Sequence, residues 1–314
     1  MKRLIKYIKY FCFLIVAAIA GKVSAQQDPN YTQYMYNMSV VNPAYALTDN
    51  DLIQAGLLYR AQWVGSVGGP TTGTLFGHMS FTDRMQGGVS IVHDEIGDVV
   101  QETNFYVDYA YVLPMGKSNA LSFGIKAGFT SFSTDFSGFV FSDPLPDPSF
   151  AENRSSFFPN VGLGTFFFGD NYYVGLSSPN ILQSEHIRDN DGVFSSAQEE
   201  LHLYLTGGYV FALSENLKLK PAFLANQVMD SPISLDVTAN LLFNDKFEIG
   251  ASYGFENEAA ALVNFKVTDY LRIGYAYDYL FSNLGRFNNG SHEVMLLLDL
   301  NRTGNGYDKS PRFF

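Results

Sequence analysis

The sequence predicts an all-β fold: a transmembrane, antiparallel, up-and-down β-barrel of about 14 strands, with an N-terminal segment outside the barrel wall. Three observations lead to this class: a two-residue alternation, the face on which charges fall, and the lengths of the connections. From residue 201 onward, apolar and polar residues alternate, most clearly in 234–243, 246–255 and 270–279. This period is typical of strands with one apolar and one polar face.

Five charged residues of the expected strands between 234 and 279 fall on the polar face; they are Asp236, Glu248, Lys266, Arg272 and Asp278. An Arg or Lys facing lipid at mid-membrane costs about 2–4 kcal/mol, whereas in a wet lumen it costs little. The charges therefore favour a barrel with a polar interior. A soluble β-sandwich also alternates, so alternation alone does not exclude it.

The connections favour the barrel over the sandwich, because short turns alternate with connections that are generally longer. The longer ones cover 64–70, 134–156, 177–200 and 280–290. Outer-membrane barrels have short periplasmic turns and long external loops. With an even number of strands, this pattern predicts the cell outer membrane as location and places both termini in the periplasm. The expected strands are 52–63, 71–82, 86–94, 99–113, 119–133, 157–168, 171–176, 201–212, 217–227, 234–243, 246–255, 258–267, 270–279 and 291–300.

The first 25 residues have the features of a secretory signal peptide. Basic residues precede an apolar run over 11–20, and small residues at 23–25 offer a cleavage site that leaves Gln26 first. The apolar run is shorter than the roughly 20 residues of a spanning helix. Cleavage removes five basic and no acidic residues, so the net charge changes from -11 to -16. Such an acidic chain is not expected to bind nucleic acid.

We find no pattern that predicts catalysis. The five histidines lack metal-ligand spacing, and no Gly-x-Ser-x-Gly elbow is present. The glycines lie inside strand patterns, where they mark bends or close packing rather than a phosphate cradle. We therefore expect no enzyme activity, no catalytic residue, no metal and no cofactor. An outer-membrane hydrolase remains an alternative on composition alone.

The mature N-terminal segment, expected over 26–50, alternates poorly and is rich in Tyr, Asn and Pro. It could plug the lumen, line the periplasmic mouth or bind another protein; the barrel itself is expected over 51–314. Prolines fix φ and an Asp can cap a local turn. Candidate partner-binding or motif residues in this segment are Asp28, Pro29, Tyr31, Tyr34, Asn42 and Pro43, and a second candidate cluster is Arg60, Gln62 and Trp63.

These residues belong to motifs that continue along the chain. The segment from Gln27 to Asn37 reads Q-D-P-N-Y-T-Q-Y-M-Y-N, and Asn42 begins N-P-A-Y-A. Arg60 begins R-A-Q-W-V-G, and Gly290 begins G-S-H-E. Together these motifs resemble the PorP/SprF family of the type IX secretion system, over essentially the whole mature chain.

The resemblance implies a non-enzymatic outer-membrane barrel that assists secretion or surface attachment of specific cargo, with gliding motility in some members. Such systems belong to the Bacteroidota. Implied partners are periplasmic and outer-membrane type IX components, secreted cargo or a surface adhesin, and outer-membrane lipid. We expect the periplasmic mouth and residues 26–46 to contact the machinery, and the external loops to contact cargo. The alternative function is an outer-membrane channel or hydrophobic-solute transporter.

Overall fold

The computed structural model describes residues 31–137, 153–182, 188–190, 193–195, 201–228, 231–255, 258–281 and 283–302. The expected signal peptide and two candidate site residues, Asp28 and Pro29, lie outside this part of the chain. Among the described residues, no helix is long and apolar enough to cross a membrane.

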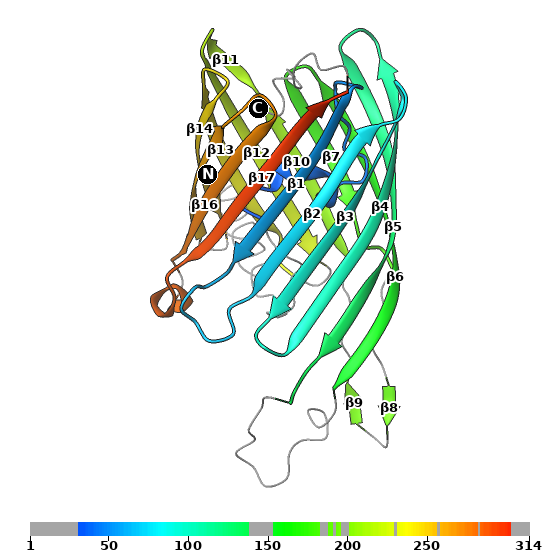
Figure 1. Ribbon diagram of the computed structural model, residues 1–314, viewed down its shortest axis with the longest axis vertical. Helices are drawn as coiled ribbons and strands as arrows, with labels where there is room; N and C mark the ends of the chain where they lie inside the picture. Colours follow the sequence, from blue (N-terminus) through cyan, green and yellow to red (C-terminus); the bar gives the residue numbers. More distant parts are fainter. Residues whose placement is uncertain are drawn as a thin grey trace, which may run out of the picture.

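The described strands form a closed, antiparallel barrel of 14 strands, which confirms the predicted fold class (Figure 1). Consecutive strands pair along the wall, β1 pairs with β17, and β10 pairs with β7 and β12 to complete the closure. β10 and β11 are two parts of one wall strand. The bounds are β1 (Leu52–Ala61), β2 (Thr71–Ser80), β3 (Met85–Ile96), β4 (Val100–Met115), β5 (Asn119–Thr134), β6 (Arg154–Gly169), β7 (Tyr172–Ser178), β10 (His202–Tyr209), β11 (Phe211–Ser214), β12 (Leu217–Val228), β13 (Ser234–Phe243), β14 (Phe247–Gly254), β15 (Glu258–Lys266), β16 (Leu271–Leu280) and β17 (Ser291–Asn301). A separate two-stranded sheet comprises β8 (Arg188–Asn190) and β9 (Val193–Ser195).

The inner and outer faces follow the predicted alternation. Leu203 is 43% exposed on the outside, whereas its neighbour His202 is 4% exposed. The charges expected in the lumen are there: Asp236, Glu248, Lys266 and Asp278 are buried, and Arg272 is half-buried. The wall is therefore apolar toward lipid and polar toward the lumen.

The connections separate into two groups at opposite ends of the barrel, which we call the loop end and the turn end. The four long connections follow β1, β5, β7 and β16, all at the loop end, which is the lower end in Figure 1. η3 (Asn283–Phe287) lies in the last of these connections. The other three loop-end connections are short, over 97–99, 229–233 and 255–257. β1 begins and β17 ends at the turn end, where Leu52 pairs with Asn301.

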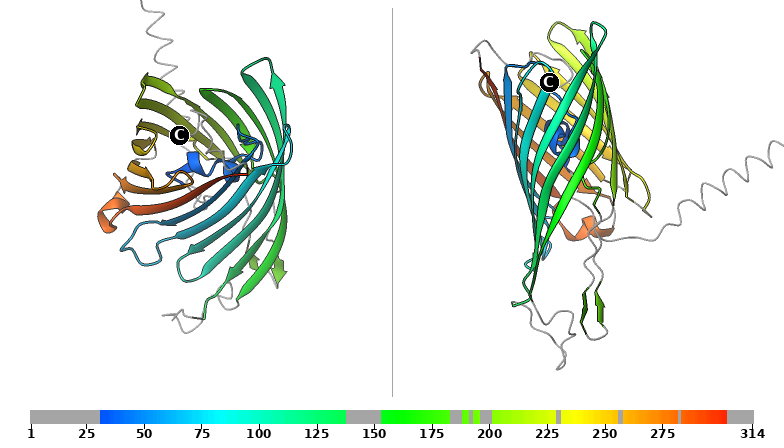
Figure 2. Two further views of the ribbon diagram at one scale, coloured as in Figure 1. Left: turned by 45° about the horizontal axis from the view of Figure 1, so that its top comes forward. Right: turned by 90° about the vertical axis from the view of Figure 1, so that its right-hand side faces the viewer.

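Residues 31–47, which we call the lumen segment, contribute no strand to the wall and lie inside the barrel (Figure 2). The segment contains η1 (Tyr34–Tyr36) and the single-turn helix α2 (Met38–Val41). Tyr34 and Met38 are 1% and 2% exposed. The segment and the inward side chains of the wall form the main buried core.

Candidate functional site: the lumen segment and its docking site

The lumen segment runs through the barrel from near the loop end to the turn end. Near its start, Thr32 contacts Asp278, which lies two residues before the loop-end limit of β16. At its end, Leu47 bonds to Gln86, the second residue of β3 at the turn end. The segment therefore occupies most of the height of the lumen.

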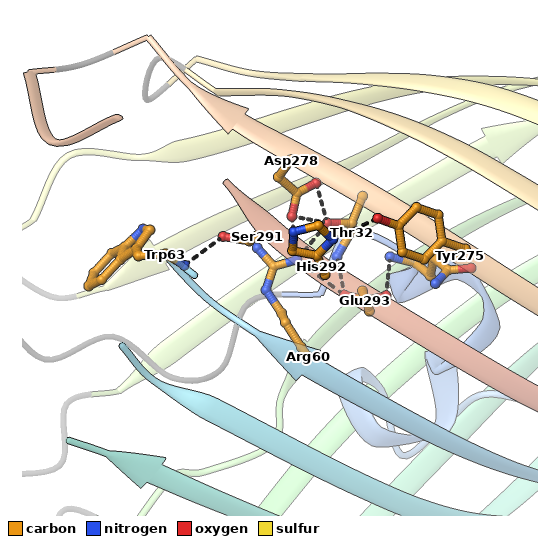
Figure 3. Close-up of polar contacts among 9 residues, drawn as sticks. Thr32, Arg60, Trp63, Tyr275, Asp278, Ser291, His292 and Glu293 are labelled. Carbon is orange, nitrogen blue, oxygen red and sulfur yellow. Dashed lines mark hydrogen bonds and ion pairs between the residues drawn. The ribbon is translucent and has the colours of Figure 1, made fainter. Parts of the chain in front are cut away.

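The start of the segment is held by the anchor cluster, which comprises Thr32, Arg60, Asp278 and Glu293 (Figure 3). The Glu293 carboxylate accepts hydrogen bonds from the backbone N–H groups of Thr32 at 3.0 Å and of Gln33 at 2.9 Å. Arg60 Nη1 pairs with Asp278 and lies 3.3 Å from Glu293 Oε2. Arg60 also donates to Thr32 Oγ1 at 2.7 Å, and that hydroxyl donates to Asp278 at 2.7 Å. The Glu293 carboxylate thus holds the segment's backbone, whereas Asp278 and Arg60 hold the Thr32 side chain.

The anchor cluster forms because the first and last strands are neighbours. Arg60 on β1 lies directly opposite Glu293 on β17, and Asp278 on β16 lies opposite Ser291. All three charged side chains face inward and are at most 5% exposed. Charges this deeply buried are stable only when they are paired. The sequence patterns did not indicate a site role for Asp278 or Glu293: alternation placed Asp278 on the polar face, and Glu293 belongs to the G-S-H-E motif.

A second charged contact lies nearer the turn end. Arg272 Nη1 donates to Glu248 Oε2 at 3.0 Å, and its guanidinium lies 5.5 Å from the centroid of the Tyr36 ring. The Tyr36 hydroxyl donates to the same carboxylate. Tyr36 belongs to the lumen segment and not to a spanning strand. Burial is the main cause that raises the pKa of its hydroxyl well above the usual value, and the nearby Glu248 charge raises it further. The hydroxyl therefore keeps its proton and remains a donor.

The middle of the segment packs against wall positions that have no side chain, which we call the glycine cradle: Gly124 and Gly164. These two glycines lie opposite each other on β5 and β6. A Cβ at Gly124 would overlap the backbone of Pro43 and Ala44, and a Cβ at Gly164 would overlap the Asn42 amide oxygen. Glycine here permits close approach of two backbones, as the strand glycines led us to expect.

Asn42 shapes the turn that enters the cradle. Its Oδ1 accepts the N–H of Ala44 at 2.9 Å, which is an Asx turn. Its Nδ2 donates to the carbonyl of Thr165 on β6 at 3.1 Å. Just before it, Lys126 Nζ donates to the carbonyl of Val40 at 2.7 Å. Lys126 therefore satisfies a carbonyl at the end of α2 that the single turn leaves free.

Where the segment leaves the lumen at the turn end, the Gln86 side chain binds two backbone groups of Leu47. Gln86 accepts the N–H of Leu47 at 2.7 Å and donates to its carbonyl at 2.9 Å. The ring of Tyr45 meets the ring of His78 edge-on, with centroids 5.4 Å apart. His78 also contacts Gln86 at 3.2 Å. The path into β1 is thus fixed by backbone and ring contacts.

The structure brings together most, but not all, of the candidate site residues. Tyr31, Tyr34, Asn42 and Pro43 are in the lumen segment, and Tyr31 is 2.8 Å from Thr74 through their hydroxyls. Arg60 meets this segment, but its expected companions do not. Gln62 bonds through its backbone to Pro70 at 2.8 Å, within the connection after β1. Trp63, with φ +50°, bonds through its N–H to Ser291 Oγ at 3.3 Å.

With this geometry established, we compared the chain with known proteins. The model of a family described as "Type IX secretion system membrane protein PorP/SprF" matches residues 23–298. The chain belongs to the PorP/SprF family. This PorP/SprF protein is therefore an outer-membrane barrel and a membrane component of type IX secretion, which works with the secretion machinery. A search of curated proteins finds no match.

One solved structure similar to this PorP/SprF protein is that of the toluene transporter TodX of Pseudomonas putida. The two sequences are 10% identical, the match covers 90% of this chain and 96% of that chain, and the TM-score is 0.46. Omp33 of Acinetobacter baumannii has 10% identity, covers 81% of this chain and 100% of its own, and has a TM-score of 0.45. A FadL homologue of Pseudomonas aeruginosa is 12% identical in sequence, with a TM-score of 0.42; the match covers 82% of this chain and 89% of that chain. At these scores the likenesses carry no argument about what this protein does.

Proposed function

We propose that this protein is a non-enzymatic barrel that assists the secretion or surface attachment of specific cargo by type IX secretion. Family membership supports the pathway. The observation that carries the proposal is the filled lumen: the chain's own segment crosses the barrel and is tied to the wall by two buried charged contacts. A barrel filled in this way is suited to binding proteins. Where the cargo is a surface adhesin, the same role extends to gliding motility.

The burial of the lumen segment bears on where the machinery binds. The described part of residues 26–46 is largely inaccessible while it occupies the lumen. We therefore assign contact with periplasmic components to the turn end and contact with cargo to the loop end, with both termini in the periplasm. In this proposal the segment acts indirectly, by holding the inner wall and the turn end in one shape.

The alternative, a channel or hydrophobic-solute transporter, requires an open path through the lumen. The contacts of Thr32, Tyr36 and Leu47 with three different parts of the wall oppose such a path. Planar-bilayer recording distinguishes the two functions. We expect the intact protein to be silent, and a steady open pore would favour transport.

Crosslinking and affinity capture from intact envelopes tests the main proposal. The comparison is between the full chain, a chain lacking residues 26–46 and the lipid-facing variant Ala261→Phe as a control for mutation itself. We expect the full chain and the control to capture the same type IX components and the deletion to lose them. Equal capture by the deletion would refute the role of the segment, and failure of the full chain to capture any component would refute the function.

A further inference from the structure

The outer face of the wall has an apolar depression, which we call the lateral groove. It spans β4, β5, β6, β7 and β10 and has a volume of about 610 Å³. Its rim consists of outward side chains that are 36–56% exposed; they are Tyr109, Phe123, Ile125, Leu163, Leu176 and Leu203. Across five adjacent strands the groove is about 19 Å wide, from the spacing of strands in a sheet.

The groove exists because a small outward residue lies among large ones. Thr165 on β6 lies opposite Phe123 on β5 and Leu176 on β7. β7 is also short, with seven residues, and ends at Ser178. Beyond that point Ile181 lines the groove and its N–H bonds to the carbonyl of Val161. The combination leaves a hollow between the side chains of five strands.

The surroundings of the groove indicate what fills it. The groove is continuous with the lipid-facing surface, where outward neighbours such as Val107, Val174 and Leu205 are apolar and 40–47% exposed. Among the described residues, no Lys or Arg lines it, so these residues offer no cation to the clustered phosphates of a lipopolysaccharide. An extended, uncharged, apolar hollow in the membrane region fits a hydrocarbon chain.

We propose that the lateral groove binds an acyl chain of one phospholipid and retains that lipid when the barrel is extracted from the membrane. The inner side of the same wall is the glycine cradle, so one backbone layer separates the bound chain from Pro43. The bound lipid thereby packs behind the point where the lumen segment docks. This inference is independent of the secretion role.

Native mass spectrometry of the full chain, purified in mild detergent, tests the proposal. Thr165→Phe fills the groove, and Thr165→Val keeps the size of the side chain. The matched control is Ala261→Phe, at an outward position of β15 far along the wall from the groove. Heat-dependent migration on gels shows that each variant forms a barrel.

We expect about one phospholipid per wild-type barrel, unchanged retention in Thr165→Val and Ala261→Phe, and at least a fivefold loss in Thr165→Phe. Equal retention by folded Thr165→Phe would overturn the site. So would the absence of lipid from the wild type, retention of lipopolysaccharide alone, or a membrane protein bound in place of lipid. If Thr165→Phe does not fold, a spin-labelled phospholipid added to the otherwise unaltered protein decides the question. We expect it to lie closer to a label at residue 176, in the groove, than to a reference label at residue 261; equal proximity would overturn the site.

Discussion

Replacing Arg60 with Met tests whether the anchor cluster holds the lumen segment. The Arg60 side chain is 5% exposed, and its two carboxylate partners, Asp278 and Glu293, are 4% and 0% exposed. The substitution keeps much of the volume but leaves two buried carboxylates without a cation. Removing one partner of a buried ion pair costs about 3–5 kcal/mol. We expect a loss of that size, with reduced protection of the Thr32 and Gln33 amides.

The assay is urea unfolding in phospholipid vesicles, followed by the fluorescence of Trp63, the one tryptophan of the chain. Hydrogen exchange of residues 32 and 33 reports the release of the segment directly. The matched control is Arg84→Met, at an exposed arginine in the turn after β2, which we expect to change the free energy of unfolding by less than about 0.5 kcal/mol. A triple change of Arg60→Met, Asp278→Asn and Glu293→Gln removes all three charges and should recover at least half of the loss. Our reasoning is wrong if Arg60→Met costs no more than the control and both amides stay protected.

Three further results are expected. Gly124→Ala places a Cβ against the backbone of Pro43 and Ala44; it should cost about 1–3 kcal/mol of stability and open a conductance in planar bilayers. The control Gly73→Ala, where a Cβ meets no atom of the described residues within 4 Å, should do neither. A silent, stable Gly124→Ala barrel would contradict the cradle. Arg272→Met leaves Glu248 buried beside Tyr36 and should destabilise by about 3–5 kcal/mol in the same urea assay, and an unchanged midpoint would show that this pair does not hold the segment. Leu205→Arg, on the lipid face in mid-wall, should cost about 2–4 kcal/mol, against about 0–1 for Leu213→Arg near the turn end; equal costs would place the lipid boundary elsewhere.

The number of strands and their inner and outer faces were readable from the sequence because both depend on local spacing. Side chains in a strand alternate between faces with a period of two, so the face of Glu248 follows from its neighbours alone. The four long connections were likewise predicted at one end. The three short loop-end connections, over 97–99, 229–233 and 255–257, do not follow the rule that external loops are long.

The position of the lumen segment was decided only by the closed structure. Its sequence left a plug, a mouth lining and a partner-binding segment open, because its residues have no regular period. Three wall elements resolve the question: the cradle at Gly124 and Gly164, the Gln86 contact, and the anchor cluster. Each brings a part of the lumen segment against wall residues that are distant from it in sequence.

Arg60 shows the difference between what local sequence and tertiary structure determine. Its inward direction follows from the alternation in β1, but its partners Asp278 and Glu293 are more than 200 residues away. They meet only because the last strand pairs with the first. The adjacent motif residues Gln62 and Trp63 lie beyond the end of β1, so they no longer follow the strand's alternation and do not join the cluster. The sequence alone thus determined which side chains face the lumen, whereas barrel closure determined which of them touch, because contacts between distant strands depend on the register of the whole sheet.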